Sequence, residues 1–516
     1  MKFIFSLLFI VFVTIACEKG KANKKVAIKK PIIEKLLPDS SFNSVQESLT
    51  YEVKVFDLTG PSMKSLKSKY SAEKGVLAFR GASSRDVVAE GQLKARPSEI
   101  KAEWEFDTEY NGKKTNLGVW GGGSGWTGQP LIINWDYAGI PASAKKYKPE
   151  ANKEVIISSL CGKIYFLNFD DGKKIRPTLD TYNPIKGTAM FDPDFSGNLL
   201  VGQGVKANSE FGFRIFNVFD GKLVKYVSGI DRDALRGWGA FDSSPIKVDD
   251  YYFWPGENGM LYKFRLIGDK FELHSKLIYR AKSRSASSLG VESSMAVYKN
   301  YGYWGDNQGN LICVNLNTLK PIWYFDNVDD SDASIVIEEE NGVPFLYVGC
   351  EVDKQGNSGF SYLRKINGLN GQSVWLNKVP AHSIDVNEKT FNGGLLSTPL
   401  LGKHQAKDLI YFSISQPGKS NAGELLALDK KTGNVKFQTK LHAYSWSSPV
   451  GFYTKSGEPF VVIGDVVGNL YLIDGLTGEK MFYKNLGGNF EASPAVMGDQ
   501  MVLGSRGNKI YKFKIL

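Results

Sequence analysis

Short stretches of alternating apolar and polar residues recur along most of this chain, and glycines separate them. The clearest example spans residues 447–486, where the segments SSPVGFYT, PFVVIGD, GNLYLIDGLTG and EKMFYKNL follow one another. Alternation with a period of two is typical of a strand that buries one face. The third segment ends on Gly478, which can adopt the positive φ that a hairpin bend requires. The pattern predicts a four-stranded antiparallel sheet over these residues.

The glycine-led third strand of this unit occurs eight times. The copies begin at Gly162, Gly212, Gly259, Gly309, Gly359, Gly423, Gly468 and Gly507. Their spacings are 50, 47, 50, 50, 64, 45 and 39 residues, which is the range of propeller blades. The longest step contains an insertion around residues 380–396. We therefore expect an all-β fold, with a single eight-bladed β-propeller of four-stranded antiparallel blades over residues 76–516.

The last copy ends at Leu516 after its third strand, so its fourth strand must come from elsewhere. Residues 101–108, KAEWEFDT, carry Trp104 where other units have an aromatic residue in the fourth strand. Pairing this segment with the last unit would close the ring and remove its free sheet edges. The aromatic residues of the fourth strands are expected to pack between blades: Trp104, Trp323, Trp375, Phe437 and Phe482.

Two turn motifs, LLALDKKTG at residues 425–433 and LIDGLTG at residues 472–478, resemble repeats of the quinoprotein (PQQ-like) propeller superfamily. The Ser-Ser-Pro strand openings and the segment Phe79-Arg80-Gly81 share this resemblance. The superfamily contains quinone-dependent dehydrogenases and non-enzymatic lipoproteins, among them the outer-membrane β-barrel assembly lipoprotein. The resemblance therefore implies the fold and leaves the activity open. A dehydrogenase would need PQQ, Ca²⁺ and an aspartate base, and several such enzymes have adjacent cysteines, which this sequence lacks. We expect no cofactor, with PQQ and Ca²⁺ as the alternative.

Residues 1–17, MKFIFSLLFIVFVTIAC, have the layout of a signal peptide with an apolar run too short to span a bilayer. The ending Thr14-Ile15-Ala16-Cys17 resembles a bacterial lipobox, in which Cys17 is lipidated. An ordinary signal peptide with a chance cysteine is the alternative. We expect a lipoprotein of the bacterial cell envelope that is anchored to a membrane and faces the periplasm or the cell surface.

The net charge of +10 is concentrated near the N-terminus. Residues 1–36 hold eight lysines and two glutamates, a net of +6, which leaves +4 for all remaining residues. Residues 18–75 are expected to be a basic tether that lies on anionic lipid or is solvated as a spacer. Because the charge belongs to the tether, we expect no nucleic-acid partner.

Acidic residues precede the first strand in four of the eight units. Aligned on the small residues that open this strand, the acids are Asp242, Glu292, Asp332 and Glu491, and Lys186 stands at the same position of another unit. The innermost strands of a propeller converge on its channel, so these acids would form an arc at one mouth. We predict a mouth that binds a cation, or a cationic or polyhydroxyl ligand. A solvated rim of loop acids is the alternative.

The loops that precede the same strands also carry aromatic residues and arginine. Trp126, Trp238 and Trp446 stand at similar offsets before three strands, and Asp231 and Arg236 lie in the loop of Trp238. Exposed Trp and Arg anchor protein partners, and aromatic rings stack on sugars. These rings either form a binding face or cap the channel by packing on one another.

We therefore expect a non-enzymatic scaffold that binds an envelope protein, a protein complex or a glycan through this loop-rich face. A PQQ-dependent dehydrogenase and a carbohydrate or small-molecule sensor are the alternatives.

Overall fold

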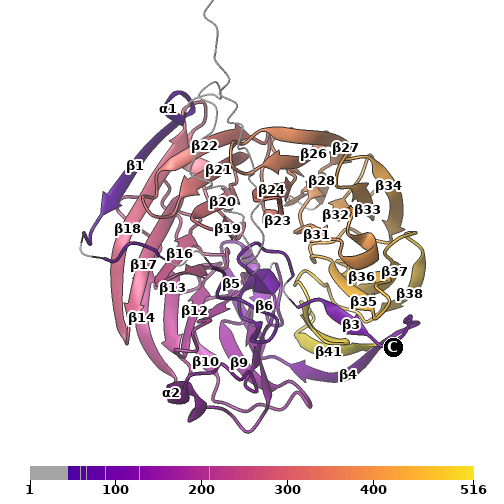
Figure 1. The fold of residues 1–516 in the computed structure, drawn as a ribbon, viewed down its shortest axis with the longest axis horizontal. Helices are drawn as coiled ribbons and strands as arrows, with labels where there is room; N and C mark the ends of the chain where they lie inside the picture. Colours follow the sequence, from indigo (N-terminus) through magenta and orange to yellow (C-terminus); the bar gives the residue numbers. More distant parts are fainter. Residues whose placement is uncertain are drawn as a thin grey trace, which may run out of the picture. The chain divides into compact units, whose positions relative to one another are not determined.

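Each predicted unit folds into one small antiparallel sheet, and eight such sheets form a closed ring in the computed structural model (Figure 1). The structure describes residues 45–58, 60–64, 67–87, 89–126, 128–208, 210–386 and 389–516. All of these residues belong to one compact unit, Pro38–Leu516. The signal segment and Cys17 lie outside the described residues. The predicted eight-bladed, all-β fold is confirmed.

The blades follow one another along the chain, and the strand nearest the channel is given first for each. Blade 1 contains β7 (Leu131–Asn134), β8 (Lys153–Ser158), β9 (Lys163–Asn168) and β10 (Leu179–Asp180). Blade 2 contains β11 (Met190–Phe191), β12 (Asn198–Gly202), β13 (Gly212–Asn217) and β14 (Lys222–Ser228). Blade 3 contains β15 (Ile246–Val248), β16 (Tyr251–Pro255), β17 (Met260–Ile267) and β18 (Lys270–Ala281). Blade 4 contains β19 (Ala296–Tyr298), β20 (Tyr301–Gly305), β21 (Asn310–Asn315) and β22 (Pro321–Asp326).

The second half of the ring repeats this order. Blade 5 contains β23 (Val336–Glu340), β24 (Val343–Val348), β26 (Ser358–Asn367) and β27 (Ser373–His382). Blade 6 contains β31 (Leu400–Leu401), β32 (Leu409–Ser415), β33 (Gly423–Asp429) and β34 (Val435–Leu441), with β25 (Glu351–Val352) and β30 (Gly393–Leu395) added to it. Blade 7 contains β35 (Val450–Thr454), β36 (Pro459–Gly464), β37 (Asn469–Asp474) and β38 (Lys480–Asn485). Blade 8 contains β39 (Ala495–Met497), β40 (Gln500–Gly504), β41 (Lys509–Ile515) and β4 (Ile100–Asp107).

The N-terminal strand β4 completes blade 8, as the strand count predicts. It pairs antiparallel with β41, from Ile100 opposite Ile515 to Asp107 opposite Lys509. Figure 1 shows the two strands side by side, one early and one late in the chain. Blade 8 therefore has its fourth strand like the other blades, and the ring is closed by residues about four hundred positions apart in sequence.

Aromatic side chains of the outer strands pack on the bend of the next blade in four seams. The contacts are Trp104 on Gly172, Trp323 on Gly371, Trp375 on Gly433 and Phe437 on Gly478. A Cβ atom at Gly433 would lie 2.6 Å from the Trp375 ring, so only glycine permits this approach. Phe482 is partly buried against the core of the last two blades.

Hydroxyl side chains form a belt at the openings of blades 3–8. In each link a backbone N–H of one blade donates to a hydroxyl of the next: Ser244 to Ser294 (2.8 Å), Ser294 to Ser334 (2.8 Å), Ser334 to Thr398 (3.2 Å), Thr398 to Ser448 (3.1 Å) and Ser448 to Ser493 (3.2 Å). The belt gives a physical reason for the small hydroxyl residues that recur at the strand openings.

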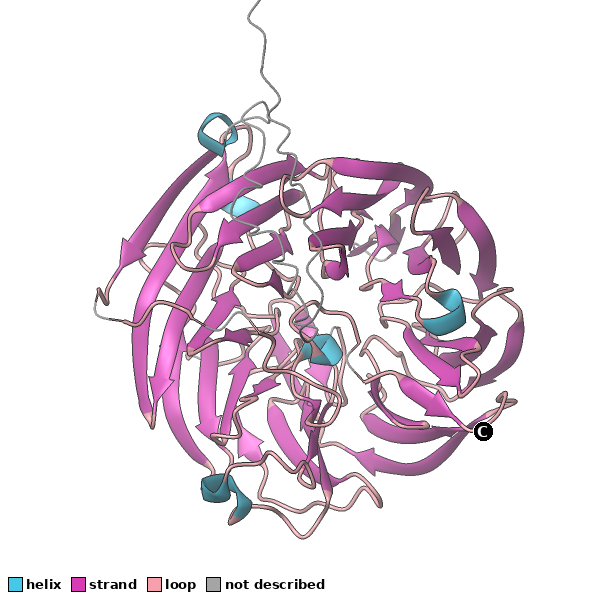
Figure 2. Cartoon of the chain, viewed as in Figure 1, coloured by secondary structure: helices cyan, strands magenta, loops and turns pink. Residues whose placement is uncertain are grey.

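Arg80 and Arg85 close the channel beneath this belt. The short helix η2 (Phe79–Gly81) lies near the middle of the ring (Figure 2), and both arginines are at most 1% exposed. Their guanidinium groups donate to carbonyls of four blades, at Pro449 (2.7 Å), Pro399 (2.8 Å), Ser244 (2.9 Å) and Met295 (2.9 Å). Burial lowers the pKa of each arginine to about 10, so both remain charged at neutral pH. The segment is a central plug, and we use that name below.

Part of the segment expected to be a tether is instead packed on the propeller. After the short helix α1 (Val45–Ser48), strand β1 (Leu49–Val55) pairs antiparallel with the outer strand β18 of blade 3. Tyr51 and Val53 pack against the core, and Lys54 forms an ion pair of 2.7 Å with Asp233. The expectation of a tether up to residue 75 is therefore wrong for β1, because β18 offers this amphipathic stretch a free sheet edge.

Several short strands and helices lie outside the four-stranded repeats. They are β2 (Gly75–Val76), β3 (Gly91–Leu93), β5 (Asn111–Thr115), β6 (Gly118–Gly121), β28 (Ile384–Val386), β29 (Lys389–Phe391), α2 (Ala142–Lys145), η3 (Ala286–Ser288) and η4 (His404–Ala406). Among the described residues, no helix has the length and apolar character needed to cross a membrane.

Candidate ligand-binding site at the channel mouth

Three carboxyl groups meet at the channel above the plug. Asp242 precedes the strand opening of blade 3, Glu292 precedes that of blade 4, and Glu257 lies in the turn between β16 and β17. One carboxylate oxygen of each lies within 4.8 Å of the others. Lys186 of the neighbouring loop forms an ion pair with Asp242 and lies 3.6 Å from Glu292. We call these four residues the first cluster.

The first cluster is buried, and each of its charged groups shifts the pKa values of the others. Burial raises the pKa of Glu257 well above its usual range, and the nearby Glu292 and Asp242 raise it further. Burial alone would lower the pKa of Lys186, but Asp242, Glu292 and Glu257 outweigh that effect and raise it. Lys186 therefore remains a cation inside the cluster, while Glu257 holds a proton.

A second cluster of carboxyl groups lies beside the first. Asp332 and Glu351 face one another and share a hydrogen bond, and burial raises the pKa of both well above the usual range. Burial also raises the pKa of Asp330 to about 7, although Lys354, whose ammonium group lies 3.4 Å from it, opposes the shift. We call Asp330, Asp332, Glu351 and Lys354 the second cluster. Burial therefore favours the protonated forms of these carboxyl groups, and a bound cation would favour the release of their protons.

A cavity of about 250 Å³ opens between the second cluster and a group of aromatic rings. Trp126 and Trp446 pack together, with ring centroids 4.2 Å apart, and Tyr444 lies beside them in the cavity wall. The ammonium group of Lys186 lies 4.6 Å from the Trp126 ring. The cavity is also lined by Glu292, Asp330, Asp332, Glu351 and the segment Thr390, Phe391 and Asn392. Aromatic rings and carboxyl groups around one cavity can hold a ligand with a positive charge and an apolar stem.

The remaining residues of the predicted face are distributed around this mouth. The Trp238 indole donates to the Glu257 carboxyl group (2.8 Å), and Arg236 donates to the Glu257 carbonyl (3.3 Å). Glu491 is paired with Arg506 at 3.2 Å, so its charge is already compensated. Asp231 accepts hydrogen bonds from Lys276 (2.5 Å) and Tyr262 (3.1 Å), and it does not line the cavity.

Sequence reasoning missed Glu257, Asp330, Glu351 and Lys354. It aligned the units on the small residues before the first strand, and this alignment identifies only the acids of one loop per blade. Glu257 lies two residues before Gly259, in the turn that leads into the third strand. A second alignment on the eight third-strand glycines would have found this position. Glu351 comes from β25 next to the insertion, where no repeat is available for comparison.

The residues of the mouth do not fit PQQ. That cofactor is a planar quinone bearing several carboxylates, whereas the two clusters contain six carboxyl groups against Lys186 and Lys354. Trp126 already has Trp446 and Lys186 against its ring. The first cluster offers the oxygen ligands that Ca²⁺ prefers, but Lys186 already supplies a positive charge there.

Comparisons with known proteins extend the description of the fold. No protein-family model matches the chain, and no curated protein matches it in sequence. A europium-containing methanol dehydrogenase superposes with a TM-score of 0.60 at 11% identity, covering 86% of this chain and 98% of the other.

Two further structures are similar over most of their length. Quinohemoprotein alcohol dehydrogenase from Comamonas testosteroni gives a TM-score of 0.59 at 13% identity, covering 87% of this chain and 82% of the other. BamB from Moraxella catarrhalis gives 0.51 at 11% identity, covering 81% and 98%. The chain therefore has the eight-bladed propeller fold that these quinoproteins and BamB share, as its PQQ-like repeats predict.

Proposed function

We propose that this chain is a non-enzymatic binding protein of the bacterial cell envelope, anchored to a membrane through a lipidated Cys17. Its channel mouth receives a positively charged group of a protein partner. The observation that carries this proposal is the cavity lined by both the rings of Trp126, Tyr444 and Trp446 and the carboxyl groups of Glu292, Asp332 and Glu351. A polyhydroxyl envelope ligand is the second candidate, favoured by the stacked indoles of Trp126 and Trp446.

Arginine and lysine side chains suit this cavity for two reasons. Their charged ends would pair with the carboxyl groups of the second cluster, and their stems and cationic faces would pack on the indoles. The plug closes the channel beneath the belt, so a side chain that enters the mouth meets a floor rather than an open pore. The mismatch between PQQ and the carboxyl groups supports a binding role over a dehydrogenase role.

The first experiment uses a short arginine-rich peptide and a glutamate-rich peptide of equal length as probes of the full chain. We expect only the arginine-rich peptide to quench tryptophan fluorescence on titration. Asp332→Asn and Trp446→Ala should each weaken its binding about tenfold, because each removes one wall of the cavity. Affinity should rise between pH 5 and pH 8, since the carboxyl groups with raised pKa values release protons when a cation binds.

Asp136→Asn is the matched control, because Asp136 is an exposed carboxylate paired with Lys148 at 2.7 Å and distant in sequence from both clusters. Equal binding of both peptides, or unchanged affinity in Asp332→Asn, would contradict the proposed site. Dye reduction by alcohols or aldoses after addition of PQQ and Ca²⁺ would contradict the non-enzymatic role. Crosslinking of the membrane-associated full chain, followed by comparison with Trp446→Ala, would then identify the partner.

A further inference from the structure

The seam between blades 1 and 2 lacks a contact that five other seams contain. In those five seams, a side chain of one blade donates a hydrogen bond to the carbonyl three residues before the bend of the next blade. The pairs are Trp104 to Phe169 (2.9 Å), Lys263 to Leu316 (3.0 Å), Trp323 to Gly368 (2.7 Å), Trp375 to Lys430 (2.9 Å) and Tyr411 to Gly475 (2.7 Å). Three of the five donors are indole N–H groups.

In the seam between blades 1 and 2, the equivalent carbonyl belongs to Val218, three residues before Gly221. Within the described part of the chain, no side chain donates a hydrogen bond to it. Arg176 stands four residues after Gly172, as Trp375 stands four residues after Gly371. Arg176 therefore stands at the position, four residues after the bend glycine, where blade 5 carries the indole of Trp375.

The Arg176 guanidinium does not reach across the seam to Val218. It forms an ion pair of 2.6 Å with Glu154 of its own blade and donates to the Tyr147 carbonyl at 3.0 Å. Glu154 is fully buried and also accepts from the Trp135 indole at 2.8 Å, so this pair is fixed. Phe219 stacks on Tyr147 elsewhere in this seam, but the bend at Gly221 is consequently left without a ring packed on it.

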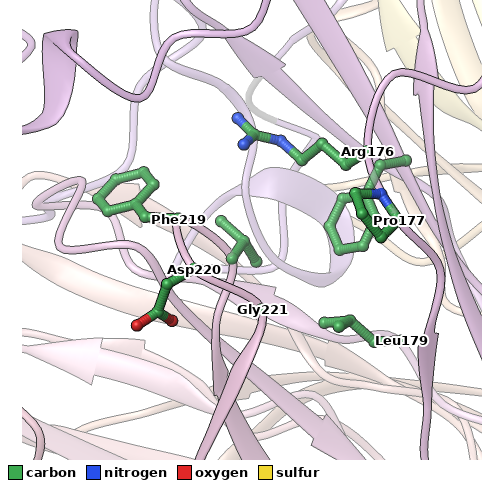
Figure 3. A pocket seen from close by; sticks show the side chains of 8 residues that line it. Arg176, Pro177, Leu179, Phe219, Asp220 and Gly221 are labelled. Atoms are coloured by element: carbon green, nitrogen blue, oxygen red, sulfur yellow. The ribbon is translucent and has the colours of Figure 1, made fainter.

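A cavity of about 370 Å³ occupies this position (Figure 3). Arg176, Pro177 and Leu179 approach it from blade 1, and Phe219, Asp220 and Gly221 approach it from blade 2. A Cβ atom at Gly221 would meet only Leu179, at 3.7 Å, whereas one at Gly433 would lie 2.6 Å from Trp375. An apolar cavity of about 150 Å³ is enough to bind benzene, so a two-ring molecule has sufficient room here.

We propose that this cavity binds a small planar aromatic molecule with a ring N–H, of the indole class. The ring would pack on the Leu179 side chain and against the edge of Phe219, whose face is stacked on Tyr147 with centroids 4.3 Å apart, and the Arg176 guanidinium would lie beside it. Its N–H would donate to the Val218 carbonyl, as three indoles of this chain do at equivalent carbonyls. The site is separate from the channel mouth, so it stands independently of the function proposed above.

Calorimetric titration of the full chain with indole tests the proposal. We expect one equivalent to bind, and 1-methylindole to bind about fivefold more weakly because it cannot donate to Val218. Leu179→Trp should fill the cavity from its own strand, weaken indole binding at least about tenfold and raise the melting temperature.

Leu223→Trp is the matched control, since Leu223 is 47% exposed on blade 2 and does not line the cavity. Indole should bind this variant as it binds the unaltered chain. The proposal is overturned if indole produces no heat, or if Leu179→Trp binds it unchanged. The comparison of indole with 1-methylindole needs no variant, and equal affinities would also overturn the proposal.

Discussion

Buried carboxyl groups at the channel mouth hold protons that exposed carboxyl groups would release. Asp330 is the member whose pKa, raised by burial to about 7, lies closest to physiological pH. It faces Lys354, Glu292 and Asp353, and only the lysine opposes the upward shift. The charge of the Asp330 side chain, and with it the net charge of the mouth, should therefore change near pH 7.

This raised pKa predicts a stability that falls as pH increases. In the unfolded chain Asp330 loses its proton near the ordinary aspartate pKa of 3.8, whereas the folded protein retains it up to about pH 7. Between these values the folded state binds more protons, so the free energy of unfolding should fall by about 1.4 kcal/mol per pH unit for this group. Asp330→Asn should flatten that slope in urea unfolding between pH 4 and pH 8.

The exposed Asp136→Asn variant provides the comparison and should keep the slope of the unaltered chain. If Asp330→Asn and the unaltered chain showed parallel stability profiles, Asp330 would not be the buried acid that responds to pH.

At the scale of single elements, β4 pairs with β41 in blade 8, and its Trp104 side chain also links it to blade 1. The Trp104 ring packs on Gly172 of blade 1, and its indole N–H donates to the Phe169 carbonyl. Trp104→Ala removes both contacts and should lower the free energy of unfolding by about 3 kcal/mol. Trp104→Phe keeps a ring and should lose only about 1 kcal/mol.

Chemical unfolding followed by far-ultraviolet circular dichroism measures both losses. Tyr110→Ala is a suitable control, because Tyr110 is 64% exposed in the loop that follows β4. Equal losses for the alanine and phenylalanine variants would mean that the hydrogen bond, rather than the ring, holds the seam.

The elements differ in how far the sequence predicts them. The third strands are predictable because a glycine recurs before each of them in the sequence. Strand β4 is predictable because the last repeat lacks a fourth strand. Strand β1 is not, since its alternating residues pair with β18 more than two hundred positions away and no turn connects them. The acids Asp242, Glu292 and Asp332 are predictable from one repeated loop. Glu257 requires a second alignment, on the glycines of the third strands. Glu351 is not predictable, because β25 belongs to no repeat and reaches the mouth only in the folded ring.

At the scale of the whole molecule, the plug connects one pair of neighbouring blades to another pair farther round the ring. Arg80 donates to blades 6 and 7, and Arg85 donates to blades 3 and 4. Arg80→Ala leaves two buried carbonyls without donors and should lower the free energy of unfolding by about 3 kcal/mol or more. Arg80→Lys should restore only part of this loss, because an ammonium group lacks the fork that reaches two carbonyls.

Differential scanning calorimetry would report the loss as a lower melting temperature. Lys222→Ala is the control, since the Lys222 side chain is 80% exposed and its surface ion pair with Asp220 should contribute less than about 1 kcal/mol. If Arg80→Ala melted like Lys222→Ala, the plug would fill the channel without stabilising the ring.

The pairing of β4 with β41 has a consequence for biosynthesis. The ribosome makes β4 about four hundred residues before its partner β41. Seven blades can assemble during translation before β41 appears, whereas the eighth must wait for it. A ribosome that stops early thus releases a product with an open sheet edge at each side of the gap, which is a recognisable substrate for proteases and chaperones. A truncated messenger RNA would therefore yield an unclosed propeller, which proteases and chaperones can distinguish from the closed ring.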